Sequence, residues 1–144
     1  NDILSADKKI AGILIENVIK QQNLSSSVIG IGLNVNQTVF ENLPKASSLK
    51  VVKGNNFDLD EILNAFIINL KAYFLILESK AFIKLKAEYE LLLFKKNKPS
   101  TFKNAEGFMF SGFIKGVSET GHLKVLLEDD ILQTFDLKQI TLLY

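Results

Sequence analysis

The sequence predicts an α+β fold that combines a strand ribbon, two helices and a small barrel of short strands. Two β-branched runs lie within residues 8–36 and are separated by a polar segment. Residues 58–95 repeat apolar side chains at helical spacing, and residues 99–144 hold short strand-like runs broken by glycine. Strands segregated from helices along a chain are typical of α+β proteins.

The composition indicates a packed protein with few routes to redox or metal chemistry. Of the 144 residues, 47% are hydrophobic and 23% are charged, which suits one domain or a partial domain with a small module. A net charge of +1 gives no electrostatic footprint for duplex nucleic acid. Cysteine is absent, which excludes disulfides and cysteine-based metal sites, and we predict no metal-binding residues.

All 17 basic residues are lysine, and arginine is absent. The chain therefore has no guanidinium group to grip a carboxylate or phosphate through two parallel hydrogen bonds. Any anion that it binds must be held by lysine, by side-chain amides or by backbone N–H groups.

The first predicted element is a two-stranded antiparallel ribbon. Residues 8–19 are rich in Ile and Val, and residues 28–36 alternate in the manner of a strand. Polar residues 21–27 between them predict the connecting loop, and residues 37–57 read as a mixed loop containing Pro44.

A helix is predicted to begin after Asp58, which is a good N-cap with Glu61 three residues later. Its apolar positions follow at helical spacing: Leu59, Ile62, Phe66, Leu70, Tyr73 and Leu77. Other apolar residues occupy the opposite side, so we expect this helix to be covered on two sides. The run is interrupted by polar side chains and is shorter than the roughly 18–20 residues of a membrane span, so no span is predicted.

A second helix is predicted over residues 81–95, ending in a lysine cluster before Pro99. Four or five short strands follow and predict a small antiparallel barrel. We expect Phe108, Phe110 and Phe113 to build its core rather than a nucleic-acid surface. His122 follows a turn and is interpreted as a surface residue.

One face of the second strand is predicted to be bare. Gly30, Gly32 and Asn34 lie two apart, so they share a face and form a flat floor that ends in an amide. Glycines inside a strand usually mark the close approach of a ligand or another backbone. The opposite face carries apolar residues predicted to enter a core: Ile29, Ile31, Leu33 and Val35.

Two lysines stand where the first strand begins. Lys8 and Lys9 point to opposite faces of a regular strand, and Gly12 again removes a side chain. A lysine at the rim of a glycine floor is a natural seat for an anion. The alternative is that the glycines permit tight twisting or close helix packing while both lysines are solvated.

These blocks together resemble the biotin protein ligases, also called biotin–[acetyl-CoA-carboxylase] ligases. The resemblance rests on residues 1–4, 8–16 and 30–36, in that order and spacing, and continues through residues 99–144. It implies that residues 1–96 are the C-terminal part of the catalytic domain, a class-II-synthetase-like mixed sheet with packed helices. It also implies that residues 97–144 are an SH3-like β-barrel.

The resemblance also implies a reaction and its residues. Such a ligase forms biotinyl-5′-AMP from biotin and ATP with Mg²⁺, then transfers biotin to a lysine of a carboxylase carrier domain. Lys9 corresponds to the family's essential lysine, which contacts both the biotin carboxylate and the adenylate phosphate. The biotin-binding residues would be Lys9, Gly12, Gly30 and Gly32, and the nucleotide-binding residues would be Asn1, Asp2 and Asn34.

Further expectations concern partners and completeness. The family's Gly/Arg-rich biotin loop lies upstream of the matched blocks, so we expect these 144 residues to be catalytically inactive alone. A cytoplasmic enzyme is implied, able to pair as a homodimer, without a membrane contact, and binding DNA only if upstream sequence supplies a helix-turn-helix. The alternatives are a lipoate protein ligase, or, for this chain alone, a non-catalytic module for dimerisation or carrier docking.

One detail conflicts with this assignment. Strict alternation places Lys9 and Gly12 on opposite faces of a strand. We therefore expect Lys9 to lie before the strand proper, where the chain can turn, and Lys8 to be its solvated neighbour.

Overall fold

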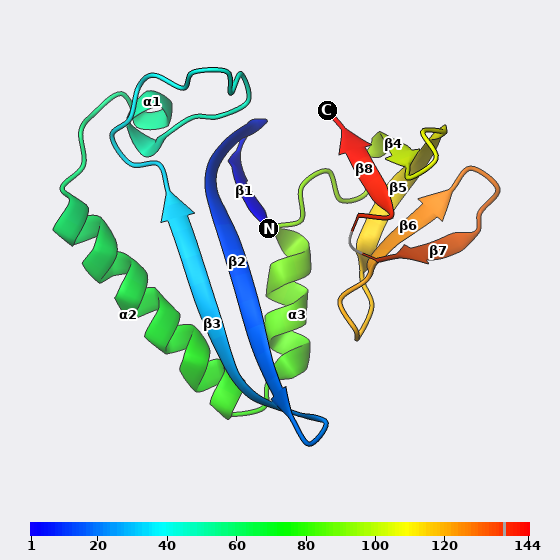
Figure 1. Ribbon diagram of the computed structural model, residues 1–144, viewed down its shortest axis with the longest axis horizontal. Helices are drawn as coiled ribbons and strands as arrows, with labels where there is room; N and C mark the ends of the chain where they lie inside the picture. The colour runs from blue at the N-terminus through cyan, green and yellow to red at the C-terminus, as the bar shows by residue number, and fades with distance from the viewer. Residues whose placement is uncertain (137) are drawn as a thin grey trace. The chain divides into compact units, whose positions relative to one another are not determined.

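The computed structural model describes residues 1–136 and 138–144 and divides into two compact units, Asn1–Lys71 and Ala72–Tyr144. Each unit has its own antiparallel sheet (Figure 1). The helix α2 (Leu59–Glu78) runs from the first unit into the second. The predicted α+β class is confirmed.

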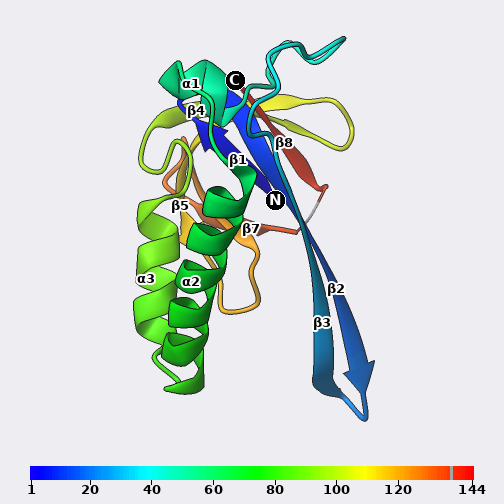
Figure 2. The ribbon, with the colours of Figure 1, turned by 90° about the vertical axis from the view of Figure 1, so that its left-hand side faces the viewer.

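The sheet of the first unit has the strand order β1-β2-β3. Its strands are β1 (Asp2–Ser5), β2 (Lys8–Lys20) and β3 (Asn23–Leu33). Figure 2 shows the β2–β3 hairpin continuing far beyond the short strand β1. The strand β1 was not predicted from the sequence. The predicted mixed sheet is wrong, because β2 pairs with both β1 and β3 in antiparallel fashion, and parallel pairing occurs at isolated bridges such as Lys9 with Ala46.

The hairpin turn is much tighter than predicted. Residues 23–27, expected in a loop, belong to β3, and only Gln21 and Gln22 connect the strands. Both have positive φ, 48° and 64°, as in a type I′ turn, whose twist matches that of the flanking strands. The sequence lacks the Asn-Gly signature of such turns. The polar run from Gln21 to Ser27 was therefore interpreted as a longer loop, although most of it belongs to β3.

The predicted core face of β3 is wrong. Ile29, Ile31 and Leu33 are 46%, 42% and 36% exposed, and β3 ends before Val35. Their alternation correctly places them on one face, but no packed layer of the described chain buries that face.

The segment after β3 contains a short helix, α1 (Leu49–Lys53), within the predicted loop. The Ser48 hydroxyl caps it by accepting the Val51 N–H at 3.2 Å. Gly54 closes it in the left-handed region at φ 82°, which suits a residue without Cβ.

The start of α2 is confirmed. The Asp58 carboxylate accepts the N–H groups of Asp60 and Glu61 at 2.8 and 3.0 Å. The expected cover on two sides is wrong, because α2 contains no buried residue. In the part of the chain that the structure describes, no helix combines the length and the apolar character needed to cross a membrane.

The next helix, α3 (Phe82–Leu91), ends four residues before the predicted limit. Lys95 and Asn97 adopt left-handed φ values of 55° and 58°, which a helix cannot contain. The chain then runs beside the second sheet, where the Asn97 N–H donates to the Ile114 carbonyl at 2.9 Å.

The second sheet has the order β7-β6-β5-β4-β8. Its strands are β4 (Pro99–Asn104), β5 (Met109–Val117), β6 (Leu123–Leu127), β7 (Leu132–Phe135) and β8 (Ile140–Leu143). These short antiparallel strands agree with the four or five that the sequence predicts. Closure into an SH3-like barrel is not confirmed, because β7 and β8 form the two edges of the described sheet.

The core of the second unit centres on Phe102, Ile114 and Val125, which are at most 4% exposed. Phe110 stacks on Phe102 with ring centroids 5.5 Å apart, as its predicted core role requires. Phe108 is 72% exposed, so its predicted core role is wrong. It lies in the tight connection between β4 and β5, where its backbone N–H bonds to Asn104.

Two further predicted positions lie at the rim of this core. Phe113 is half-buried and lies outside the buried cluster, with the Lys115 ammonium 5.8 Å from its ring centroid. His122 is half-buried, with its Nε2 3.8 Å from an Asp136 carboxylate oxygen.

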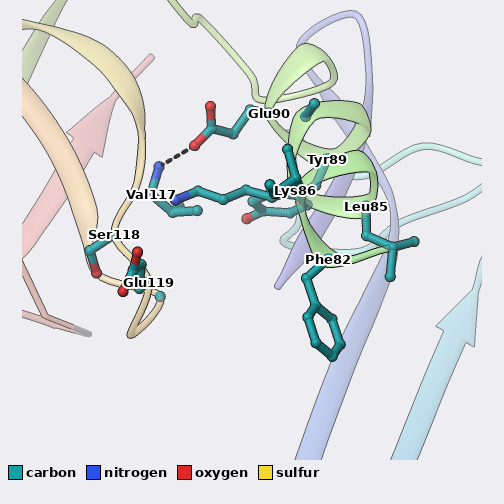
Figure 3. A pocket seen from close by; sticks show the side chains of 11 residues that line it. Phe82, Leu85, Lys86, Tyr89, Glu90, Val117, Ser118 and Glu119 are labelled. Atoms are coloured by element: carbon teal, nitrogen blue, oxygen red, sulfur yellow. Dashed lines mark hydrogen bonds between the residues drawn. The ribbon is translucent and has the colours of Figure 1, made fainter. Parts of the chain in front are cut away.

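Glu90 of α3 fixes the irregular point of β5, where Lys115 is an extra residue in the ladder. One carboxylate oxygen accepts the Val117 N–H at 3.0 Å (Figure 3), and the other lies 3.3 Å from Lys96 Nζ. A Cβ at Gly116, where φ is 149°, would overlap this carboxylate. The Val117 N–H above all, and then Lys96, lower the pKa of Glu90 below its usual 4.5.

This lowered pKa predicts an acid-sensitive contact. A group that is more acidic in the folded state stabilises the fold above its ordinary pKa, and that contribution disappears as the pH falls through the lowered value. We expect Glu90→Gln to reduce the free energy of unfolding most at neutral pH, with the difference from the unsubstituted chain shrinking at acid pH. Urea unfolding across the acid range measures it.

The matched control is Glu106→Gln, which neutralises an exposed acid in a turn of the same sheet. It should change the unfolding free energy little at any pH. A Glu90→Gln penalty that stays constant down to strongly acid pH would contradict the assignment.

Candidate functional site

Two glycines lie side by side on one face of the first sheet, next to an aspartate on β1. Asp2 lies directly opposite Gly12, and Gly12 lies directly opposite Gly32, so all three occupy the same face. A Cβ added to Gly32 would have no neighbouring atom within 4 Å. We call Gly12 and Gly32 the glycine row. The space at Gly32, on the outer strand β3, is open, whereas the space at Gly12 is covered by a lysine side chain.

Lys9 lies over this row. An added Cβ at Gly12 would be 3.6 Å from Lys9 Cε and 3.7 Å from Lys9 Nζ. The sequence expectation that Lys9 precedes the strand is wrong, since Lys9 is the second residue of β2. A bulge resolves the conflict instead: Ile3 faces Ala11 while Leu4 faces Lys9, so Ile10 is an extra residue. The extra residue turns Lys9 onto the face of Gly12.

The Lys9 ammonium is paired with Asp2, at 2.7 Å from its carboxylate. Both side chains remain accessible, with 43% and 41% of their surfaces exposed. The Lys9 backbone is fixed more firmly, because its N–H donates to Lys45 at 2.7 Å and its carbonyl accepts from Ser47 at 2.8 Å. The amine is therefore presented from a rigid base but can reach a ligand.

The face changes character beyond the glycine row. Gly30 lies opposite Leu14, and an added Cβ at Gly30 would be 4.0 Å from Leu14 Cβ. Leu14 is 63% exposed. A cation, a bare step and an apolar wall thus follow one another, an arrangement that suits a carboxylic acid with an apolar body.

Lys8 is separated from this face. Its ammonium donates to the Pro44 carbonyl at 2.8 Å, so it is anchored to a loop rather than only solvated as expected. The two neighbouring lysines therefore differ in what they can bind.

The two asparagines predicted to contact a nucleotide make structural hydrogen bonds, Asn34 through its side-chain amide and Asn1 through its backbone carbonyl. The Asn34 side chain follows the end of β3 and donates to the carbonyl of buried Ser47 at 3.0 Å. The Asn1 carbonyl accepts the Ile13 N–H at 2.9 Å. Asn34 is thus held beside the site by its NH₂ group, and the predicted free polar handle is not observed.

Asn36 was given no role from the sequence but supports the site. Its amide donates to the Phe57 carbonyl at 2.8 Å and its oxygen accepts the Phe57 N–H at 2.9 Å. This pair ties the end of β3 to the segment before α2. An Asn-x-Asn pattern directly after a strand is the signal that could have indicated it.

The first unit holds no competing metal centre within the described chain. Among residues 1–136 and 138–144, no group of three or more His, Cys, Asp or Glu side chains is placed to hold an ion. A separate hollow of about 1000 Å³ lies in the second unit, between α3 and the turn after β5 (Figure 3). Phe82, Leu85 and Tyr89 line it, and none of the predicted site residues does.

Comparison with known proteins gives a fold match. No protein-family model and no curated protein matches the chain. Solved structures of biotin protein ligase from Aquifex aeolicus do: the apo form at 23% identity and the complex with biotin and ATP at 24%, both with a TM-score of 0.75. Both alignments cover 99% of this chain. The chain spans 62% and 59% of the length of those two ligase chains.

The Asn36 clamp predicts a measurable loss of stability. Asn36→Ala removes two part-buried hydrogen bonds and leaves the Phe57 backbone groups unpaired. We expect the free energy of unfolding to fall by about 1–3 kcal/mol. Asn55→Ala, at an exposed position, is the control and should stay within about 0.5 kcal/mol. Equal losses in the two variants, measured by urea unfolding, would refute the clamp.

Proposed function

We infer that this chain is part of a biotin protein ligase, which forms biotinyl-5′-AMP and then biotinylates a lysine of a carboxylase carrier domain. The observation that carries this proposal is the Lys9 ammonium held over the glycine row. The fold likeness to a ligase solved with biotin and ATP supports it. A cytoplasmic location and an ability to pair as a homodimer belong to the same proposal.

The first step requires two anions to meet. The biotin carboxylate attacks the α-phosphate of ATP, an acyl–phosphate bond forms, and pyrophosphate leaves. A fixed ammonium group offsets the repulsion between the reacting anions. Lys9 is suited to this role because its backbone is anchored on both sides while its amine remains accessible.

The neighbouring residues would share the binding. Gly12, Gly30 and Gly32 supply a floor that the biotin rings can approach closely. Asn1, Asp2 and Asn34 border the nucleotide, where Asn34 retains its side-chain oxygen for a ligand while its NH₂ is held by Ser47. The acceptor lysine amine then attacks the acyl carbon, and AMP leaves.

Although the sequence predicts no metal-binding residue, we propose that Mg²⁺ is held chiefly by the substrate phosphates, with the Asp2 carboxylate beside it. Mg²⁺ commonly takes one or two carboxylates together with substrate phosphates. Asp2 supplies such a carboxylate, at present paired with Lys9. When bound, the ion would neutralise polyphosphate oxygens.

The proposal assigns residues 1–96 to the catalytic domain and residues 97–144 to the C-terminal domain. Because the chain spans about 60% of the length of the ligases it matches, we propose that it supplies Lys9 and the floor but not the whole site. These 144 residues alone are then expected not to release pyrophosphate from ATP with biotin.

Substitution of the two adjacent lysines should separate their roles. In the protein that carries this chain, Lys9→Ala should lower biotin-dependent pyrophosphate release about a hundred-fold or more, because it removes the fixed cation. Lys8→Ala is the matched control and should change the rate less than about two-fold, since Lys8 bonds to Pro44. The reverse order of effects would refute the assignment.

The same assay distinguishes the alternatives. Activity with lipoate in place of biotin would identify a lipoate ligase. For the 144-residue chain alone, binding of a carrier domain or pairing into a dimer, without adenylation, would indicate the non-catalytic module instead.

A side chain added at Gly32 should obstruct the floor without weakening the sheet. Gly32→Val fills space that is open in the structure and introduces a good strand former. We expect unchanged or higher thermal stability together with at least a ten-fold loss of biotin affinity, about 1.4 kcal/mol. Ile31→Val alters the opposite face and should preserve the affinity. Retained binding in Gly32→Val would show that the acid does not cross the glycine row.

A further inference from the structure

The Lys9 ammonium already has a counter-ion at the place where an anionic ligand would meet it. Its Nζ lies 2.7 Å from an Asp2 carboxylate oxygen, above the Gly12 backbone. Asp2 and Gly12 are direct cross-strand partners, so β1 places this carboxylate at the start of the glycine row. The amine and its counter-ion together carry no net charge.

The backbone specifies this pair. Without the bulge, with Ile10 in regular alternation, Lys9 would point to the other face of β2, away from Asp2. Bulges commonly re-aim a side chain beside a functional site. The pairing therefore follows from the strand register and does not depend on a chance meeting of two long side chains.

The pair is also easy to open. About two-fifths of each side chain is exposed to solvent. Exposed ion pairs of this kind contribute little, because water screens the attraction and ordering both side chains costs entropy. A ligand carboxylate or phosphate can therefore replace Asp2 at Lys9, and the open step at Gly32 gives it room beside the amine.

We propose that Asp2 is an exchangeable lock on Lys9, which holds the amine over the glycine row and must give way to the acid or phosphate of the substrate. This deepens the proposed function and rests on it for the identity of the ligand. In the ligand-free chain the lock limits the reactivity of the amine and disfavours weak adventitious anions. Once displaced, the Asp2 carboxylate is released at the edge of the site.

Competitive amine labelling of the 144-residue chain tests the lock without any ligand. Limiting acetic anhydride is added, and fragment-ion mass spectrometry compares acetylation of Lys9 with that of Lys8 in the same peptide. Asp2→Asn, which keeps the shape and removes the charge, should raise Lys9 labelling about two- to five-fold, the range expected for an exposed ion pair. Asp2→Glu restores a carboxylate and should return labelling towards the original rate.

Asp7→Asn is the matched control, because it removes the same charge from the turn between β1 and β2. It should leave Lys9 labelling unchanged. Unchanged labelling in Asp2→Asn, or an equal rise in Asp7→Asn, would overturn the lock. Hydrogen exchange at the Ile13 amide, which bonds to Asn1, reports whether β1 stays paired in each variant.

Biotin and its neutral amide separate this inference from the proposed function. In the protein that carries this chain, Asp2→Asn should raise affinity for biotin relative to biotinamide by the same factor of about two to five, because only the acid competes with Asp2. A fall in that ratio would overturn the lock. Failure of the unsubstituted protein to bind biotin would remove the proposed function, while the labelling result would still decide the lock.

Discussion

The first unit depends on placing one ammonium group against bare backbone. Lys9 lies over Gly12 because the bulge at Ile10 turns both residues to one face, and the missing side chain at Gly12 leaves the space beneath its amine clear. The hydrogen bonds of the Lys9 backbone to Lys45 and Ser47 fix the origin of the side chain. The remaining contacts of the unit, including the amide clamps after β3, hold the strand and loop that make this arrangement rigid.

The division of labour among the polar residues follows from the hydrogen-bond demands of the backbone. β3 ends at Leu33, and the chain must turn without leaving buried carbonyls unpaired. The Asn34 side-chain amide donates to the Ser47 carbonyl, and the Asn36 side-chain amide donates to the Phe57 carbonyl. Asn34, which the sequence places beside a ligand site, is therefore also structural, so substituting it disturbs the Ser47 segment that supports Lys9 as well as any ligand contact.

The sequence predicted the features that local physics determines. The alternation of the ribbon and the Asp58 cap were readable because a strand period and an N-cap depend on neighbouring residues. The Gln21-Gln22 turn was missed because both residues have positive φ values although neither is glycine, the residue that usually indicates such a turn. The bulge at Ile10 was missed because a bulge is defined by the pairing of β2 with β1, which the sequence of β2 alone does not show. The exposure of Ile29 and Ile31 was missed because burial depends on which other elements pack against that face.

The extra residue in β2 has a consequence for transplanting this site. Because Ile10 is an extra residue, the side chains that precede it in β2 point to the face opposite to the one that unbroken alternation would give them. The run Lys8–Glu16, moved alone into another sheet, would straighten into unbroken alternation and part the amine from its floor. A functional graft must include β1, whose register accommodates the surplus residue, and β3, which carries Gly30 and Gly32, so the smallest portable unit is all three strands.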